Sequence, residues 1–160
     1  MRHFLISALL LSATPFLSVL PAGADIAPRA GWVVIPTEKE HSVLLADLKA
    51  AVKSHGLSVV TQAGPTATAR KRGITIPENR VVGVFNNDFA VKVLATSTTA
   101  MIEAPIRFYV TENADNSATL SYKTPGFVFA PYLDEGGDAL AKLAQELDAI
   151  FASIAATASD

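Results

Sequence analysis

The chain has 160 residues, half of them hydrophobic, and 13 basic against 15 acidic side chains give a net charge of −2. This near-balance argues against nucleic acid as a partner, because binding to phosphates by charge requires many clustered cations. The absence of cysteine excludes disulfides, thiolate nucleophiles, iron–sulfur clusters and cysteine-ligated zinc. The protein is therefore expected to be stabilised by packing alone.

The N-terminal 24 residues have the pattern of a cleavable export signal. Arg2 provides a positive start, residues 4–20 are a charge-free apolar run, and residues 22–24 form an Ala-Gly-Ala exit. A retained anchor is the alternative, but the run is shorter than the roughly 20 apolar residues that span a bilayer. We expect cleavage after Ala24, a periplasmic or secreted location, and no membrane segment in the remaining domain, residues 25–160.

The first half of this domain predicts alternating strands and helices. Residues 32–35 form a short apolar strand ended by Pro36, and Thr37 and Glu40 have the capping-box spacing of a helix that follows directly. Apolar residues recur on one face of this helix until Gly56 offers a left-handed stop. Further elements are expected as a strand over residues 57–61, a short helix over 66–72 and a buried strand over 81–85.

The second half predicts a helix over residues 89–95, a β-hairpin, an irregular aromatic stretch over 127–132 and a final amphipathic helix. The hairpin strands cover residues 106–111 and 118–123. One face of the final helix carries an apolar stripe of Leu140, Leu143, Leu147, Ile150, Phe151 and Ile154. The elements together predict a single α+β domain, with a mostly antiparallel sheet, helices packed on it and a C-terminal amphipathic helix.

Several short motifs occur in an order that resembles a known family. These are Ala69-Arg70-Lys71-Arg72-Gly73 followed by Ile74-Thr75-Ile76-Pro77, then Phe85-Asn86-Asn87-Asp88, Ala104-Pro105, and Ser121-Tyr122-Lys123-Thr124-Pro125. Over residues 32–131 the chain resembles the bacterial family called domain of unknown function 302. It departs from the family's Phe-Gly-Asn-Pro turn, where Asn86 and Asp88 replace the glycine and the proline. The resemblance implies a fold, but no reaction, cofactor or catalytic residue.

The residues that carry chemistry in other proteins form no recognisable constellation here. His41 and His55 are 14 residues apart on one predicted helix, about 21 Å along its axis, so they cannot share a metal ion. No Gly-x-Ser-x-Gly or Ser-x-x-Lys motif marks a nucleophile. Glu103 lies between apolar residues, where burial would raise its pKa toward the range of a general base, although an exposed loop carboxylate is the alternative. We therefore predict no metal and no cofactor.

Amide, hydroxyl and aromatic groups after the buried strand favour binding of a small polar ligand without catalysis. The candidate ligand-binding residues are Phe85, Asn86, Asn87, Thr98, Glu103 and Tyr122. The alternative is purely structural, because asparagines routinely end strands and cap helices and a hairpin tyrosine is commonly core. The sequence thus favours a non-catalytic binding or interaction module; the alternatives are a hydrolase-type enzyme with a site assembled by the fold, and a structural partner in envelope stress.

The predicted hairpin also favours self-association. If its aromatic residues Phe108, Tyr109 and Tyr122 lie on an exposed sheet edge or face, a second copy can cover them, and two-fold pairing is the usual solution. The alternative is a monomer in which the C-terminal helix covers this face. We expect a homodimer.

Overall fold

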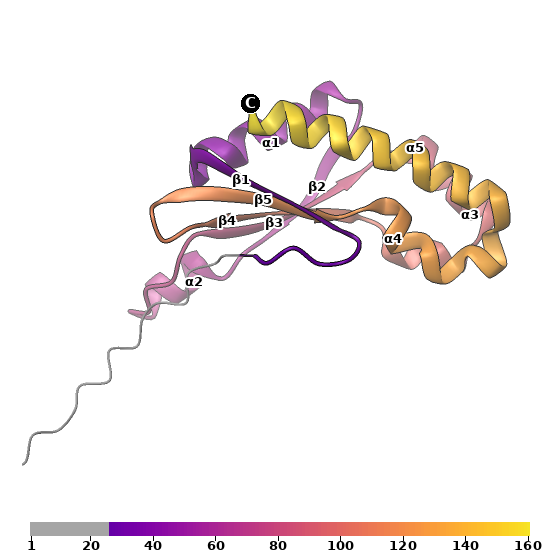
Figure 1. Ribbon diagram of the computed structural model, residues 1–160. Coiled ribbons are helices and arrows are strands. Elements are labelled where there is room, and N and C mark those ends of the chain that lie inside the picture. The colour runs from indigo at the N-terminus through magenta and orange to yellow at the C-terminus, as the bar shows by residue number, and fades with distance from the viewer. Residues whose placement is uncertain (1–25) are drawn as a thin grey trace, which may run out of the picture.

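Five strands form one antiparallel sheet in the order β1-β5-β4-β3-β2 in the computed structural model, which describes residues 26–160 (Figure 1). The predicted export signal therefore lies outside the described residues. Each strand is antiparallel to its neighbours, and β4 lies at the centre. The strands are β1 (Trp32–Glu40), β2 (Ser58–Ala63), β3 (Asn79–Phe85), β4 (Ile106–Glu112) and β5 (Ser117–Lys123).

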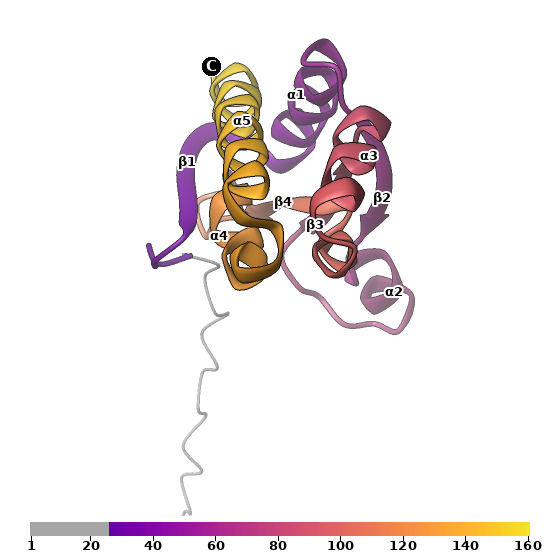
Figure 2. The ribbon, with the colours of Figure 1, turned by 90° about the vertical axis from the view of Figure 1, so that its right-hand side faces the viewer.

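Three of the helices cover one face of this sheet, as Figures 1 and 2 show for α1, α3 and α5. The short helix α2 lies on the other side, close to the ends of β2 and β3 that it connects. The helices are α1 (His41–Ser54), α2 (Thr66–Lys71), α3 (Asn87–Thr96), α4 (Pro125–Phe129) and α5 (Leu133–Ser159), with 3-10 turns η1 (Thr99–Glu103) and η2 (Ala130–Tyr132). Within residues 26–160, no helix has the length and apolar character that a membrane crossing needs. The predicted α+β class is confirmed.

The hydrophobic core fills the space between the sheet and the helix layer. Phe108 of β4 stacks on Phe151 of α5 with ring centres 4.6 Å apart, and Tyr122 of β5 tilts against both rings. The predicted stripe on α5 is core, because Leu140, Leu143, Leu147, Phe151 and Ile154 are each at most 8% exposed, and Ile150 is half-buried. The C-terminal helix thus contributes more buried residues to the core than any other helix of the described part.

The start of α1 differs from the prediction. Thr37 is not the helix cap: β1 continues past Pro36 to Glu40, and α1 begins at His41. Thr37 pairs with Ala118 in the sheet, and its hydroxyl donates a hydrogen bond to the Ala118 carbonyl oxygen at 2.8 Å. Proline is tolerated inside this strand because β1 is an edge strand, where one side of the backbone needs no partner.

The stretch expected to be irregular, residues 127–132, is instead part of α4 and η2. Thr124 caps α4, because its side-chain oxygen accepts a hydrogen bond from the backbone N–H of Phe127 at 3.2 Å. Pro125 occupies the first turn, where a missing N–H costs nothing. A capping threonine followed by proline is a local signal for a helix start, and it is present in the sequence at Thr124 and Pro125.

The hairpin is present, but it supplies no sheet edge. Its strands β4 and β5 are interior, and the two edges of the sheet are β1 and β2. Phe108 and Tyr122 point into the core and are almost fully buried, so they are not exposed as expected. Tyr109 alone of the three aromatic residues points to the opposite face.

Candidate ligand-binding site

The sheet face opposite the helix layer carries aromatic, hydroxyl and cationic side chains. Because side chains alternate along a strand, the neighbours of the core residues Phe108 and Tyr122 point away from the core. In register, Lys123 lies opposite Trp32, and Ser121 lies between Val34 and Tyr109. We call this surface the open face, and its side chains are those of Trp32, Val34, Val81, Arg107, Tyr109, Ser121 and Lys123.

A groove of about 410 Å³ lies on the open face at the end of the sheet where β4 begins and β5 ends, and the core residues Ile106, Phe108 and Tyr122 also contribute to its lining. Its walls include the aromatic rings of Trp32 and Tyr109 and the apolar side chain of Val81, and its polar groups come from β4 and β5 except for Glu103. Glu103 and Val128 contribute to the lining from outside the sheet. Apolar walls with a few convergent polar groups are the usual composition of a small-molecule site.

The cations on the open face have no carboxylate partner. The ion pairs formed within residues 26–160 join Lys39 to Asp47 and Arg70 to Glu78, and none involves the open face. Two cations instead approach the ring of Trp32: the Arg29 guanidinium carbon is 5.0 Å and the Lys123 Nζ 5.8 Å from the ring centre. Arg107 is exposed and lines the groove together with Lys123. This end of the groove is therefore positively charged and holds its cations against an aromatic surface.

Ser121 has the most unusual environment of the groove residues. It is 0% exposed, and its Oγ has no hydrogen-bond partner. Leaving a buried hydroxyl unsatisfied costs about 1–3 kcal/mol. Thr111 shares this property farther along the same face, but it does not line the groove. A hydroxyl without a partner in the groove lining is a group that a ligand can satisfy.

Two of the predicted site residues, Glu103 and Tyr122, line this groove. The carboxylate of Glu103 accepts a hydrogen bond from the hydroxyl of Tyr132 at 2.7 Å, and this bond raises the pKa of Tyr132 above its usual value. The ring of Tyr122 packs in the core, where burial, with a smaller contribution from Asp148, raises the pKa of its hydroxyl. Glu103 is thus already engaged, and the ring of Tyr122 is structural.

The other predicted residues lie elsewhere. Asn86 caps α3: its Oδ1 accepts hydrogen bonds from the N–H groups of Asp88 and Phe89, and its Nδ2 donates to the carbonyl oxygen of Gly56 at 2.9 Å. Phe85 and Asn86 also line an apolar cavity of about 50 Å³ between the sheet, α3 and α5, and both share a separate surface hollow with Asn87, which is exposed at the start of α3. Thr98 is exposed and lines neither the groove nor this cavity. The amide of Asn86 therefore has the structural role of a helix cap, which was the alternative to ligand binding.

Sequence reasoning missed most of the groove, although a signal was present. Strict alternation in the two hairpin strands places Arg107 and Tyr109 on one face of β4 and Ser121 and Lys123 on the same face of β5. These four residues therefore share a surface that can be read from the sequence once the register is known. The contribution of Trp32 depends on the pairing of β1 with β5, which is far apart in the chain.

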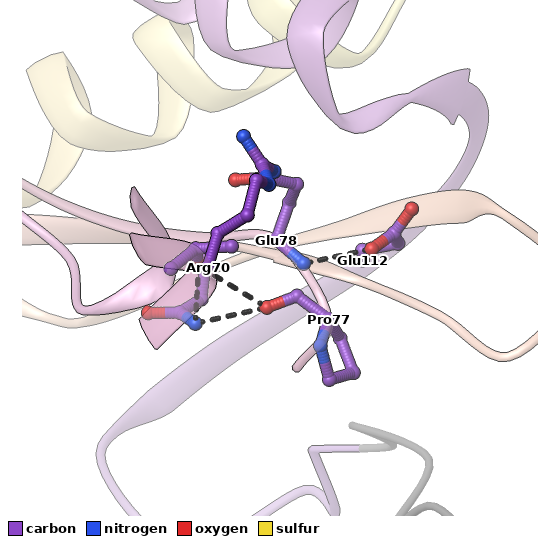
Figure 3. A network of polar contacts seen from close by, with 6 residues as sticks. Arg70, Pro77, Glu78 and Glu112 are labelled. Carbon is purple, nitrogen blue, oxygen red and sulfur yellow. Dashed lines mark hydrogen bonds and ion pairs between the residues drawn. The ribbon is translucent and has the colours of Figure 1, made fainter. Parts of the chain in front are cut away.

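A second polar cluster lies where α2 connects to β3 (Figure 3). Arg70 pairs with Glu78 at 2.6 Å, the backbone N–H of Glu78 donates to Glu112 at 2.7 Å, and Asn79 bonds to the carbonyl oxygen of Pro77 at 3.1 Å. These bonds attach the segment after α2 to the sheet. Among the described residues, histidine and acidic side chains nowhere gather in threes with a geometry that suits a metal ion.

His41 lies beside this cluster, at the start of α1. It shares a surface hollow with Glu78 and Glu112. Burial is the largest influence on its ring and lowers the pKa, against the raising effect of these two carboxylates; Arg80 lowers the pKa further. The Nε2 atom is buried without a hydrogen-bond partner. His41 is therefore held in its neutral form more strongly than a histidine in water.

Fold and groove together define a class: a single α+β domain whose antiparallel sheet has one face under helices and the other open. Residues 33–154 match the domain of unknown function DUF302, and the chain belongs to this family. The match extends beyond the resemblance predicted over residues 32–131 and includes most of α5. Among curated proteins, no sequence matches this chain.

The fold is also that of a solved structure of the same family. The crystal structure of an uncharacterized conserved DUF302 protein from Bacillus stearothermophilus is similar with a TM-score of 0.71 and 15% sequence identity, and the similarity covers 81% of this chain and 98% of that one. At this identity the similarity establishes the fold alone.

Proposed function

We propose that this protein is an exported, non-catalytic binding module that holds a small polar ligand in the groove of the open face. The observation that carries the proposal is the unpartnered hydroxyl of Ser121, buried in a groove with aromatic walls and unpaired cations. A group that costs stability in the empty protein is retained where a bound molecule makes use of it.

The groove favours binding over catalysis. A nucleophilic serine needs a base within hydrogen-bond distance, and the Oγ of Ser121 has no such neighbour. Glu103, the predicted candidate for a general base, is bonded to Tyr132. Both histidines of the described part, His41 and His55, lie outside the groove lining. The available groups recognise a ligand and do not form a reacting pair.

A binding screen tests the proposal directly. Trp32 is the only tryptophan of the chain and lines the groove, so its fluorescence reports on occupancy. We expect at least one class of small polar metabolite to change this fluorescence saturably and to raise the melting temperature. The variant Trp32→Phe should lose the optical signal and keep the shift in melting temperature. A broad screen in which no compound changes either property would remove the proposal.

We also propose export, with removal of residues 1–24. The support is the positive start, the apolar run and the Ala-Gly-Ala exit of the sequence. The intact mass of the protein from the periplasm or medium of a bacterial host should match a chain that begins at Asp25. Ala24→Leu should leave the leader attached, because the cleavage site requires a small residue. A wild-type product that retains Met1, or stays in carbonate-washed membranes, contradicts this proposal.

Self-association through the β2 edge is a further part of the proposal. The edge strand β1 carries a proline and charged residues, which discourage pairing with a second sheet, whereas β2 contains neither. Val60, within β2, is 50% exposed. Two copies that pair their β2 strands antiparallel around a two-fold axis would extend the sheet. The open face is a poorer contact, because a two-fold contact there would bring its cations close to their copies.

A further inference from the structure

We infer that the groove of the open face takes a small planar anion, of which an aromatic carboxylate is the simplest example. This inference rests on the proposed binding function and specifies its ligand class. It is carried by two properties of the groove: unpaired positive charge and aromatic walls that lie beside the buried hydroxyl of Ser121.

The charge of the site selects an anion. Arg107 and Lys123 line the groove, Arg29 lies against the Trp32 ring that forms one wall, and none of the three has an ion-pair partner among residues 26–160. The one carboxylate of the lining, Glu103, accepts a hydrogen bond from Tyr132 and is outnumbered by Arg107 and Lys123. A carboxylate bound there gains charge-assisted hydrogen bonds that a neutral ligand does not gain, and a cationic ligand is repelled. The local field is positive although the whole chain carries a net charge of −2.

The walls of the groove favour a ligand with a flat, apolar ring. Trp32 and Tyr109 stand on strands that flank β5, one on each side, and Ser121 and Lys123 lie on β5 between them. An aromatic ring gains contact area and favourable geometry against these rings. The hydroxyl of Ser121 lies buried in the lining without a partner, and an acceptor oxygen of the ligand that reaches it gains a donor. The two selections together describe a ring that bears a carboxylate.

Trp32 provides the readout for a matched set of probes. Benzoate combines the ring and the charge; benzyl alcohol has the ring without charge; benzylamine has the opposite charge; cyclohexanecarboxylate has the charge without a flat ring. We expect benzoate to change Trp32 fluorescence saturably and to bind more tightly than the other three. Binding should weaken as sodium chloride is raised, because the cations are exposed to screening.

Substitutions identify the groups responsible. Arg107→Gln and Lys123→Gln should each weaken benzoate binding about three- to tenfold, the range of partly exposed charge-assisted contacts. Lys142→Gln, which removes an exposed cation of α5 outside the groove lining, is the matched control and should leave affinity unchanged. Ser121→Ala should raise the melting temperature of the empty protein and lower its affinity for benzoate. Substitution of a residue with a purely structural role would not raise the melting temperature and lower the affinity at the same time.

The outcomes distinguish a failure of the proposed ligand class from a failure of the proposed binding function. If benzyl alcohol or benzylamine binds as tightly as benzoate, the ligand class is wrong while the binding function of the groove stands. If Lys142→Gln weakens binding as much as Arg107→Gln, the attraction is not local to the groove and the inference is overturned. If neither these probes nor any compound of the broad screen changes Trp32 fluorescence or melting temperature, the proposed function itself fails.

Discussion

His41 couples the protonation of one side chain to the stability of the domain. It is 8% exposed, and burial lowers its pKa below the value of 6.5 that it has in the unfolded chain. The folded protein therefore binds fewer protons at this site than the unfolded one. The contribution of His41 is constant above about pH 6.5, and stability is lost as the pH falls below that value.

This linkage predicts a pH dependence that one substitution removes. Between pH 7.5 and pH 5.5, the free energy of unfolding of the wild type should decrease more than that of His41→Gln, measured by urea unfolding at each pH. The matched control is Val43→Gln, because Val43 is exposed on α1 and carries no titratable group. Its pH dependence should follow the wild type. Parallel curves for the wild type and His41→Gln would show that His41 titrates alike in both states.

At the scale of elements, α5 is the helix on which the core depends most. Leu147 is 6% exposed and lines the apolar cavity of about 50 Å³ together with Phe129 and Phe151. Leu147→Ala enlarges a space that is already incompletely filled, and it should lower the free energy of unfolding by about 2–5 kcal/mol. The control Leu94→Ala, at an exposed position of α3, should change it by less than about 0.5 kcal/mol. Equal effects from both variants would place α5 outside the core.

The elements that the sequence predicts well are those with a local signal. The stripe of α5 and the turn between the strands of the hairpin depend on residues close in the chain, and both are found where expected. The end of β1 was misplaced because Thr37 and Glu40 carry a capping pattern, while the partner that holds Thr37 in a strand, Ala118, is distant in sequence. A non-local hydrogen bond outweighs the local preference.

The candidate site was harder to predict than the fold for the same reason. Asn86 and Asn87 are predicted site residues because they follow a buried strand, yet the amide of Asn86 makes three hydrogen bonds within the structure. Trp32 joins Tyr109 and Ser121 only through the strand order β1-β5-β4. This strand order cannot be predicted from residue types or from their spacing in the sequence. The groove residues could therefore be identified only once the topology of the sheet was known.

For the molecule as a whole, the unprotected β2 edge predicts a concentration-dependent homodimer. Light scattering over a dilution series should show a dimer that dissociates to a monomer. Val60→Lys places a charge on this edge and should shift the protein to a monomer at all concentrations. The control Val43→Lys introduces the same charge at an exposed position of α1 and should leave the dimer intact. A wild type that is monomeric throughout the series contradicts the proposal.

The antiparallel pairing of β1 with β5 also has a consequence for how the chain acquires its structure. Among the described strands, β5 is the only neighbour of β1, and the hydrogen bond from Thr37 to Ala118 spans 81 residues. The far end of α5 then closes over the same region, where Lys39 donates a hydrogen bond to the carbonyl oxygen of Ala158. A growing chain thus holds its first strand without a partner until β5 has been synthesised. Contacts of such long range slow folding, so we expect the nascent chain to remain unfolded for longer than a chain whose first strand pairs with a sequence neighbour.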